Sequence, residues 1–322
     1  GLLQGVLVGI LATVVLFAIN YSRINVIRSS LSRTTYQSNV ERSPHYQEYL
    51  QSEGEKIYIL KLQGFIFFGT AFNLLHNIKL RLKDTELAHL QFLVLDYRLV
   101  HGIDSSALNS FTQIRHLAEL HNFRIIFADI SDIIKKQLSK GEILVSEDNI
   151  ARQCLDIDHA VEWCENELLN HITQIRPPSI KIQLSGIFPA SIEIDRFLDY
   201  LEEQIVDENT ILIRKGDPPH GIYFIERGQI TVQMKLETGE ITRLRSMGPG
   251  TIVGELGVYL NNPASVTVVT DLASIVHTLT LEALEKMEQE DPALASAFHK
   301  FMVSYLGQRL VNTNTTLREF ME

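Results

Sequence analysis

The chain opens with an uncharged apolar run. Residues 1–22 carry no acidic or basic side chain, and residues 1–20 read GLLQGVLVGILATVVLFAIN. A helix needs about 20 apolar residues to cross a bilayer, so this pattern predicts a transmembrane helix over 1–22. Gly1, Gly5 and Gly9 recur every fourth residue, and small side chains on one helix face let another membrane helix approach closely. A signal peptide and a buried helix are the alternatives, but no charged segment precedes the run and no A-x-A cleavage site follows it.

Basic residues follow the apolar run directly. Arg23, Arg28 and Arg33 come before the first acidic residue, Glu41. Positive charge just past a membrane helix marks the cytoplasmic side, so we expect a membrane protein whose remaining residues lie in the cytoplasm. The same arginines suit anionic lipid of the inner leaflet. The glycine face predicts further membrane helices upstream, which would make this chain a fragment of a longer protein.

The next part of the chain alternates between strand and helix patterns. Residues 23–55 are largely polar and aperiodic, which predicts a juxtamembrane linker. Residues 56–172 then read as an α/β domain with a mixed or parallel sheet. Its predicted strands are 57–62, 92–95 and 123–130, and its predicted helices are 72–82, 105–121 and 156–169.

The last part changes to many short strands. Residues 173–191 contain Pro177, Pro178 and Pro189 and predict a second linker. A short acidic helix is expected around 192–204. Strands are then expected at 211–213, 222–225, 230–234, 242–245, 266–269 and 275–279, with turn residues between them. This spacing is typical of a β-roll or jelly roll, which we place at 192–312 with helices at its end and a tail at 313–322.

Composition excludes several classes of protein. There are 29 basic and 39 acidic residues, a net charge of −10, so nothing favours a nucleic-acid partner. The two cysteines, Cys154 and Cys164, form no CxxC pair. The eleven histidines are scattered, and none stands at ligand spacing from a carboxylate or a cysteine. HExxH, P-loop and GxSxG motifs are absent, so we expect no metal, no cofactor and no enzyme.

One short motif stands between a predicted strand and a predicted helix. Asp104, Ser105 and Ser106 occupy the helix start, where such side chains cap free backbone N–H groups. A phosphate on this turn would face the positive end of the helix dipole, so a phosphorylation switch is the functional interpretation.

The first half resembles a known family. The stretches YSRINVIRSS, LQGFIFFGTAFNLL, HAVEWCENELL and, most specifically, VLDYRLVHGIDSSA resemble the end of a SulP-family anion transporter, from the last membrane helix through the cytoplasmic STAS domain. The resemblance implies secondary transport of sulfate, bicarbonate or related anions. It also implies an upstream membrane domain that holds the anion site, and a STAS domain that aids dimerisation, trafficking or regulation. STAS domains are similar to bacterial anti-sigma-factor antagonists, in which the serine corresponding to Ser106 is phosphorylated.

The second half resembles the cyclic-nucleotide-binding domain family. Two stretches show this resemblance, in this order: IRKGDPPHGIYFIERGQITV and MGPGTIVGELGVYLNNPASVTVV. The resemblance places Gly254, Glu255 and Leu256 in a phosphate-binding cassette, with Glu255 accepting the ribose 2′-hydroxyl. Backbone N–H groups near Ala264 and Ser265 would meet the cyclic phosphate. The glycines of the same stretch read GxGxxxG in a β context with no helix signal after them, so we reject a dinucleotide loop.

One residue departs from this family pattern. Binders carry an arginine directly after the proline that corresponds to Pro263, whereas this chain has Ala264 there and no Lys or Arg from 254 to 284. Losing that charge-assisted bond costs about 1.5–3 kcal/mol, or about ten- to more than a hundredfold in affinity. Arg243 and Arg245 on a preceding strand are the candidates for compensation. We therefore expect cAMP or cGMP to bind weakly or not at all, to a degenerate domain.

Two hypotheses follow. The leading one is the regulatory cytoplasmic part of a SulP-like anion transporter, with the upstream membrane domain and a second copy of the chain as partners. The rival is a single-pass, membrane-tethered signalling module that is switched by Ser106 phosphorylation or by a nucleotide.

Overall fold

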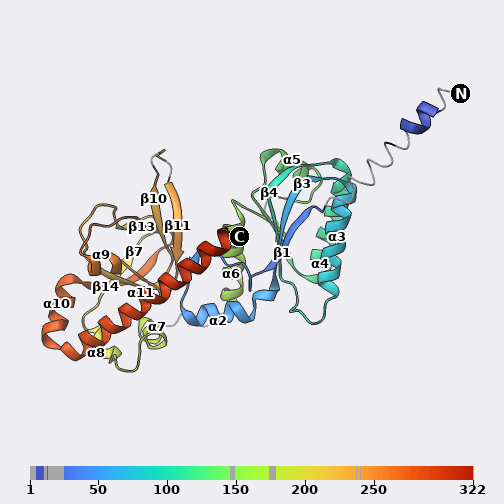
Figure 1. The fold of residues 1–322 in the computed structure, drawn as a ribbon. Helices are drawn as coiled ribbons and strands as arrows, with labels where there is room; N and C mark the ends of the chain where they lie inside the picture. Colours follow the sequence, from blue (N-terminus) through green and yellow to red (C-terminus); the bar gives the residue numbers. More distant parts are fainter. Residues whose placement is uncertain are drawn as a thin grey trace. The chain divides into compact units, whose positions relative to one another are not determined.

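The chain divides into two compact units (Figure 1). The computed structural model describes residues 5–10, 13, 25–145, 149–173, 179–236, 238–239 and 241–321. The first unit comprises Gly1–Ser38 and Tyr49–Ile172, and the second comprises Asn39–Glu48 and Thr173–Glu322. Each unit is described by itself.

A mixed sheet of five strands forms the centre of the first unit. Its order is β1-β3-β4-β5-β6, in which β1 is antiparallel to β3 and each later pair is parallel. The strands are β1 (Ile27–Ser32), β3 (Ile57–Ile66), β4 (Phe92–Ile103), β5 (Arg124–Ala128) and β6 (Ala151–Cys154). Leu93, Val94 and Leu95 of β4 are all fully buried, as expected of a central strand that is covered on both faces. The predicted α/β sheet is confirmed.

Helices surround this sheet. They are α3 (Phe68–Lys83), α4 (Leu108–His121), α5 (Asp132–Lys140) and α6 (Ile157–Thr173), with 3-10 turns η1 (Gly54–Lys56) and η2 (Ser105–Ala107). α3 buries Leu74, Leu75 and Ile78, the positions that predicted it. The sequence did not predict α5 and β6. α5 has only Ile134 and Leu138 on its buried face, so its hydrophobic pattern is short.

The stretch 23–55 is not the linker that its polar sequence predicts. It contains β1, which pairs with β3, and α2 (Pro44–Ser52), which buries Tyr46 and Leu50. It also contains β2 (Val40–Glu41), a strand of the second unit's sheet. β1 and β2 pair with strands that are not adjacent to them in the sequence, so local hydrophobic periodicity does not predict these pairings.

Arg33 is a buried residue of the first unit and not a flanking charge that can reach lipid. Its side chain is 1% exposed, and its Nε donates to Glu165 Oε1 at 2.9 Å, where the acceptor side chain is also 1% exposed. The Ser38 hydroxyl donates to the other oxygen of Glu165 at 2.5 Å. A buried charge persists only when it is paired in this way, which corrects the expected lipid contact for Arg33. Arg28 is exposed on β1, and Arg23 lies outside the described residues.

The predicted transmembrane helix over 1–22 lies largely outside the described residues. Residues 5–10 and 13 are helical, and the Thr13 hydroxyl donates to the Gly9 carbonyl at 2.8 Å. A methyl group on Gly5 or Gly9 would meet no described atom within 4 Å, and Gly1 is not described. Within the described ranges, no helix combines the length and the apolar character that a membrane crossing requires.

Two sheets form the β-roll of the second unit. Their orders are β2-β11-β10-β13-β8 and β12-β9-β14-β7, and every pair except β2 with β11 is antiparallel. The strands after β2 are β7 (Glu202–Val206), β8 (Ile211–Ile213), β9 (Gly221–Arg227), β10 (Ile230–Lys235), β11 (Ile241–Met247), β12 (Ile252–Val253), β13 (Thr267–Thr270) and β14 (Ser274–Thr280). Each of the predicted strands overlaps an observed one, so the predicted β-roll is confirmed.

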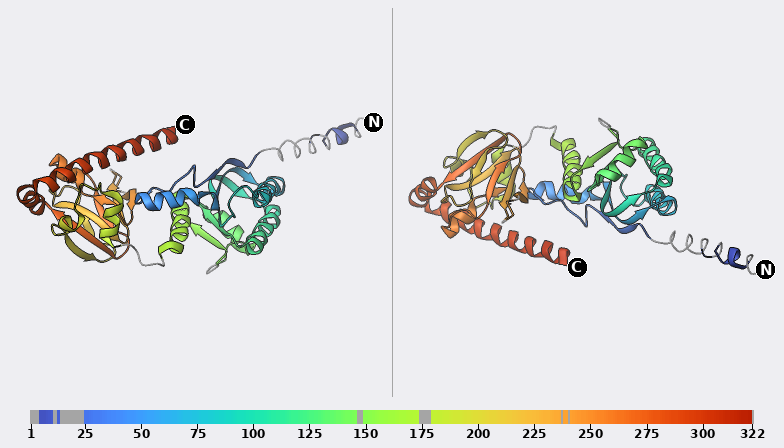
Figure 2. Two further views of the ribbon diagram at one scale, coloured as in Figure 1. Left: turned by 90° about the horizontal axis from the view of Figure 1, so that it is seen from below. Right: turned by 90° about the horizontal axis from the view of Figure 1, so that it is seen from above.

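In the described part of the second unit, five helices accompany the β-roll. Both views in Figure 2 show the last of them as the long red helix that ends at the C-terminus. They are α7 (Ile180–Ile187), α8 (Ile194–Leu198), α9 (Glu255–Leu260), α10 (Leu281–Glu290) and α11 (Pro292–Met321). α7 lies inside the predicted linker 173–191. The helix expected over 192–204 is only α8, because Glu202–Val206 pairs with β14 instead. Phe197 of α8 packs against both a strand and a helix. Its ring centroid lies 5.7 Å from that of Phe224 on β9 and 5.1 Å from that of Phe298 on α11.

β2 brings a distant segment to the edge of this β-roll. It pairs in parallel with β11, with Val40 opposite Ser246 and Glu41 opposite Met247. The Ser246 N–H donates to the Asn39 carbonyl at 3.1 Å, and the Gly248 N–H donates to the Glu41 carbonyl at 3.0 Å. The chain therefore enters the second unit at Asn39, returns to the first at Tyr49, and enters the second again at Thr173.

Candidate functional site

A cavity of about 690 Å³ lies in the second unit. Its lining comes from strands β8 to β13, the cassette region around α9, the turn at Ala264 and Ser265, and α11. Most of its side chains are apolar, among them Leu212, Tyr223 and Val268. An apolar cavity of this size with a few polar groups is the usual form of a small-molecule site, so this is the candidate functional site.

The cassette begins at a glycine that no other residue replaces easily. Gly254 follows β12 with a φ of +90°, and a Cβ there would lie 2.7 Å from the Gly221 carbonyl oxygen. Both the left-handed backbone and this close approach require glycine. α9 starts at the next residue, so a helix does follow the glycines, contrary to the sequence-based expectation. It has six residues and lies among the strands of the β-roll, which is not the setting of a dinucleotide loop.

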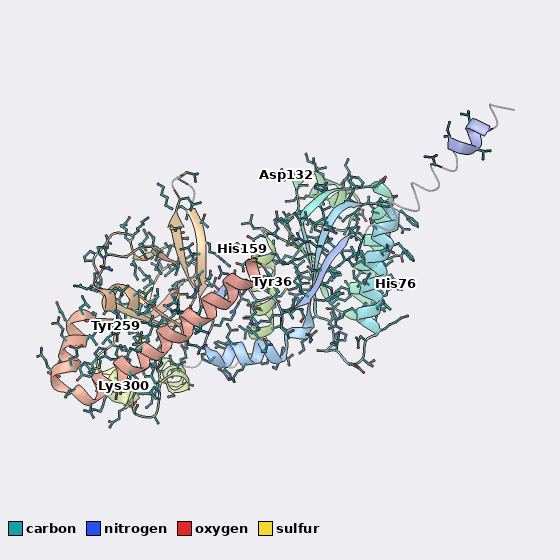
Figure 3. The ribbon with its side chains drawn as sticks, in the orientation of Figure 1. Tyr36, His76, Asp132, His159, Tyr259 and Lys300 are labelled. Carbon is teal, nitrogen blue, oxygen red and sulfur yellow. The ribbon has the colours of Figure 1, made fainter. Side chains whose placement is uncertain are left out.

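Glu255, the first residue of α9, is held by an arginine of α11. The Glu255 side chain is 2% exposed, and its Oε1 accepts from Arg309 Nη1 at 2.6 Å. Leu256, next in the cassette, is exposed and lines the cavity. α9 has a second link to α11, because the Tyr259 hydroxyl (labelled in Figure 3) lies 2.8 Å from His299 Nδ1.

The same arginine binds Glu41 of β2. Arg309 Nε lies 3.3 Å from Glu41 Oε2, and Arg245 Nη1 donates to that oxygen at 2.8 Å. The Tyr305 hydroxyl donates to Glu41 Oε1 at 3.0 Å. Arg309 therefore connects three elements, namely the cassette helix α9, the terminal helix α11 and the inserted strand β2. None of these contacts is visible in the sequence, because Glu41 and Arg309 stand near opposite ends of the chain.

Burial and charge oppose each other in this network. Burial raises the pKa of Glu255 above its usual value, while Arg309 acts to lower it. Burial acts to lower the pKa of Arg309, but Glu41 and Glu255 raise it above its usual value. Burial and Glu41 together raise the pKa of Tyr305. Arg309 is thus charged throughout the physiological range and holds two carboxylates.

The turn that should meet a phosphate is already hydrogen-bonded to another turn. The Ala264 N–H donates to the Asp217 carbonyl at 2.9 Å, and the Gly216 N–H donates to the Ala264 carbonyl at 2.8 Å. In this structure the N–H of Ala264, which the family resemblance places at the phosphate, is therefore already used by the Asp217 carbonyl. Ser265, the next residue, is exposed and lines the cavity.

Among the described residues, three arginines from outside the cassette line the cavity, namely Arg214, Arg245 and Arg309. The sequence pointed to Arg243 and Arg245, and of these two Arg245 is the one in the lining. Arg214 and Arg309 were missed. Arg214 directly follows a predicted strand, and this position could have indicated a lining residue. Arg309 lies far from the cassette in the sequence, so no local pattern indicates its role.

The Asp104 turn of the first unit has the capping geometry that the sequence predicts. Asp104 Oδ1 accepts from the Ser106 N–H at 2.9 Å and from the Ser105 hydroxyl at 3.2 Å. The hydrogen bond from the Ser106 N–H is the main cause of a lowered pKa at Asp104. The Ser106 hydroxyl accepts from the Phe68 N–H at 3.2 Å, and all three residues of the turn are exposed. The turn is thus open to a modifying enzyme.

Histidines do contact carboxylates, contrary to the expectation from their scattered positions. His277 Nε2 on β14 lies 2.7 Å from Glu226 Oε2 on β9, and both residues are buried. His159, labelled in Figure 3, pairs with an aspartate three residues earlier. Among the described residues, two groups have ligand-type atoms within 4.8 Å of one another, namely Asp156, Asp158 and His159, and Glu203, Glu226 and His277. Glu226 and His277 come from strands far apart in the sequence, so spacing does not reveal their contact, whereas Asp156 and His159 are only three residues apart.

Comparisons with known proteins identify both units. The family model of the STAS domain matches residues 51–152, and that of the cyclic nucleotide-binding domain matches residues 203–291. A vacuolar basic amino acid transporter of Saccharomyces cerevisiae is 31% identical over 185 residues, which are 53% of this chain and 17% of that protein. A cAMP-dependent protein kinase regulatory subunit of Eremothecium gossypii is 30% identical over 103 residues, which are 32% of this chain and 20% of that protein.

The chain therefore spans no more than about a fifth of the length of these relatives. Among solved structures, a cyclic nucleotide-binding domain from Methylobacillus flagellatus is similar with a TM-score of 0.36 and 22% identity, over 37% of this chain and 67% of that chain. The two family matches fall in different units, one in each. The chain contains a STAS domain followed by a cyclic nucleotide-binding domain.

Proposed function

We propose that this chain is the regulatory part of a SulP-like secondary transporter of the sulfate and bicarbonate class, located on the cytoplasmic side of the membrane. The supporting observation is the succession of a STAS domain and a cyclic nucleotide-binding domain in a chain that is 31% identical over 185 residues to a vacuolar basic amino acid transporter. An upstream membrane domain of the same protein would be its partner, and the STAS domain would support a homodimer.

The contacts of Arg309 suggest how such a regulator works. The arginine holds Glu255 beside the cavity and Glu41 on β2, so a change at the cavity alters the support of residues 39–48. Those residues lie between the N-terminal apolar run and the main body of the STAS domain in the sequence. A ligand that shifts α11 would therefore change the segment that precedes the STAS domain.

The test is a comparison of transport by the full-length protein and by a form that lacks residues 203–291. Both are reconstituted into vesicles in equal amounts, and uptake of radiolabelled sulfate is followed. We expect the full-length protein to take up sulfate and the deletion to change the rate or the substrate dependence of uptake. Equal uptake by both forms would remove the regulatory role.

The substrate class needs a separate arm, because the yeast relative is named as a transporter of basic amino acids. Uptake of radiolabelled arginine is measured in the same vesicles. Sulfate uptake without arginine uptake supports the anion class. Arginine uptake without sulfate uptake contradicts it and leaves the regulatory role of this chain to be judged by the deletion alone.

A second candidate rests on the exposed Ser106 at the start of a helix. In that case the chain is a membrane-tethered signalling module that is switched by phosphorylation. Stoichiometric phosphate at Ser106, found by mass spectrometry of the purified protein, together with absence of transport would favour it. Loss of transport on replacing Ser106 with Ala would instead make the same turn a control point of the transporter.

A further inference from the structure

We propose that the cavity of the second unit binds an amphiphilic organic anion, and that Arg214 supplies the positive charge that the cassette lacks at Ala264. Three independent observations support this assignment: the position of Arg214, its lack of an ion pair among the described residues, and the apolar lining of the cavity.

Arg214 stands at the right place. It follows β8 and opens a turn that is hydrogen-bonded to the turn carrying Ala264, through Gly216 N–H to the Ala264 carbonyl at 2.8 Å and Ala264 N–H to the Asp217 carbonyl at 2.9 Å. The Lys215 N–H adds a bond to Thr267 Oγ1 at 3.2 Å. The two turns are thereby fixed side by side. Arg214 therefore stands near Ala264, the cassette position that lacks an arginine.

Arg214 is also available. The other two arginines of the lining are committed, because Arg309 holds Glu255 and Glu41, and Arg245 holds Glu41. Arg214 is exposed and forms no ion pair with any residue in the described part of the chain. An unpaired guanidinium in a mostly apolar cavity attracts an anionic group, because it forms directed, charge-assisted hydrogen bonds.

The rest of the lining defines the ligand. Leu212, Val253, Leu306 and other apolar side chains provide most of the surface, so the ligand carries an apolar or aromatic body beside its charge. Glu255 is nearly fully buried and held by Arg309 at 2.6 Å, so its carboxylate is bound to the protein and not offered to a ligand hydroxyl. Recognition in this conformation therefore depends on charge and apolar surface and does not require a ribose.

This ligand would be the regulatory input of the proposed transporter, so the inference names the ligand class of that function. The experiment uses the purified chain without any transport assay. A failure to bind anions therefore leaves the vesicle comparison intact, and a failure of transport leaves the binding result intact.

The experiment is an NMR titration that follows the amide signals of Ala264 and Ser265, with calorimetry for affinity. The probes are cAMP, 8-anilinonaphthalene-1-sulfonate (an aromatic anion without ribose), adenosine (an uncharged analogue) and inorganic sulfate. The variants are Arg214→Gln and, as a matched control, Arg227→Gln, an arginine of the same unit outside the cavity lining. Ala264→Arg is added to Arg214→Gln as a rescue.

We expect both organic anions to shift these amides and to bind more tightly than adenosine or sulfate. Arg214→Gln should weaken both by about ten- to a hundredfold, the usual effect of losing one charge-assisted bond. Arg227→Gln should leave affinity unchanged, and Ala264→Arg should restore part of the loss. Equal affinity in Arg214→Gln, sulfate binding as tight as that of the organic anions, or no anion binding would each overturn the proposal.

Discussion

At the scale of single residues, each unit contains buried charges that are paired with one another. Arg33 and Glu165 pair in the first unit, and Arg309 pairs with Glu255 and Glu41 in the second. An ion pair that is removed from water adds little net stability, but removing one partner leaves a charge that neither water nor protein satisfies. A substitution that removes one partner of such a pair should therefore lower the free energy of unfolding more than the substitution of an exposed charge does.

Arg33→Met is the clearest case. Because both side chains of the pair are 1% exposed, the variant leaves Glu165 buried without its cation, and we expect the free energy of unfolding to fall by about 3–5 kcal/mol. The measurement is urea denaturation followed by the fluorescence of Trp163, which belongs to the same unit. Arg28→Met, an exposed arginine on β1, is the matched control and should cost about 0.5 kcal/mol or less. Equal losses in both variants would contradict the role of the pair.

Arg309→Gln should give a loss of stability that depends on pH. Removing the arginine takes away the charge that opposes burial at Glu255, so the pKa of that carboxyl group, already raised, should rise further. The folded state then binds a proton more readily than the unfolded state, and its stability falls as pH rises through the interval between the two pKa values. The deficit of the variant relative to the parent should be about 3 kcal/mol near neutral pH and smaller in acid.

The measurement is urea denaturation of both proteins from neutral to mildly acidic pH. Adding Glu255→Gln to Arg309→Gln should recover part of the stability and flatten the pH dependence, because no carboxylate remains to be stranded there. A deficit that is constant with pH would show that Arg309 acts through packing alone.

The sequence predicted part of the cassette and missed its partners. A local motif predicts Gly254 and Glu255 as cassette residues and Ala264 in place of an arginine, and all three line the cavity. Arg309 was not identified, because an ion pair between an α9 residue and an α11 residue leaves no periodic pattern. For the same reason the use of the Ala264 N–H by Asp217 could not be anticipated.

At the scale of elements, β2 is the part that differs most from expectation. It is two residues long, and isolated short strands carry little stability of their own. Its attachment depends on the bonds from Ser246 and Gly248 and on the charges around Glu41. Longer elements with a regular apolar pattern, such as α3 and β9, were predicted from the sequence because their own residues determine them.

Glu41→Gln should loosen β2 without unfolding the β-roll. The neutral amide loses its charge-assisted bonds with Arg245 and Arg309, which we expect to weaken the attachment by about 1.5–3 kcal/mol. Hydrogen exchange of the Ser246 and Gly248 amides should accelerate, because their acceptors are carbonyls of this segment. Glu48→Gln, an exposed glutamate of α2, is the control and should leave exchange unchanged. Unchanged exchange in Glu41→Gln would mean that the backbone bonds alone hold the strand.

At the scale of the whole molecule, neither unit is a single continuous stretch of the sequence. The second unit takes residues 39–48 from a stretch that precedes the STAS domain, so no single cut in the sequence separates the two units cleanly. A cut at the polar, proline-containing stretch before Ile180 leaves the β-roll without β2. The edge of β11 is then open, and the cations of Arg245 and Arg309 lose Glu41.

This arrangement predicts complementation. The fragment 173–322 should melt at a lower temperature than the same fragment mixed with a synthetic peptide of residues 38–48, because the peptide restores a strand at an open sheet edge. The rise in melting temperature should grow with peptide concentration and should be much smaller for a peptide carrying Glu41→Gln. A scrambled peptide of the same composition tests for nonspecific effects. If the native peptide has no effect at any concentration, β2 contributes nothing to the β-roll, and the path from the cavity through Arg309 to the segment before the STAS domain would be lost with it.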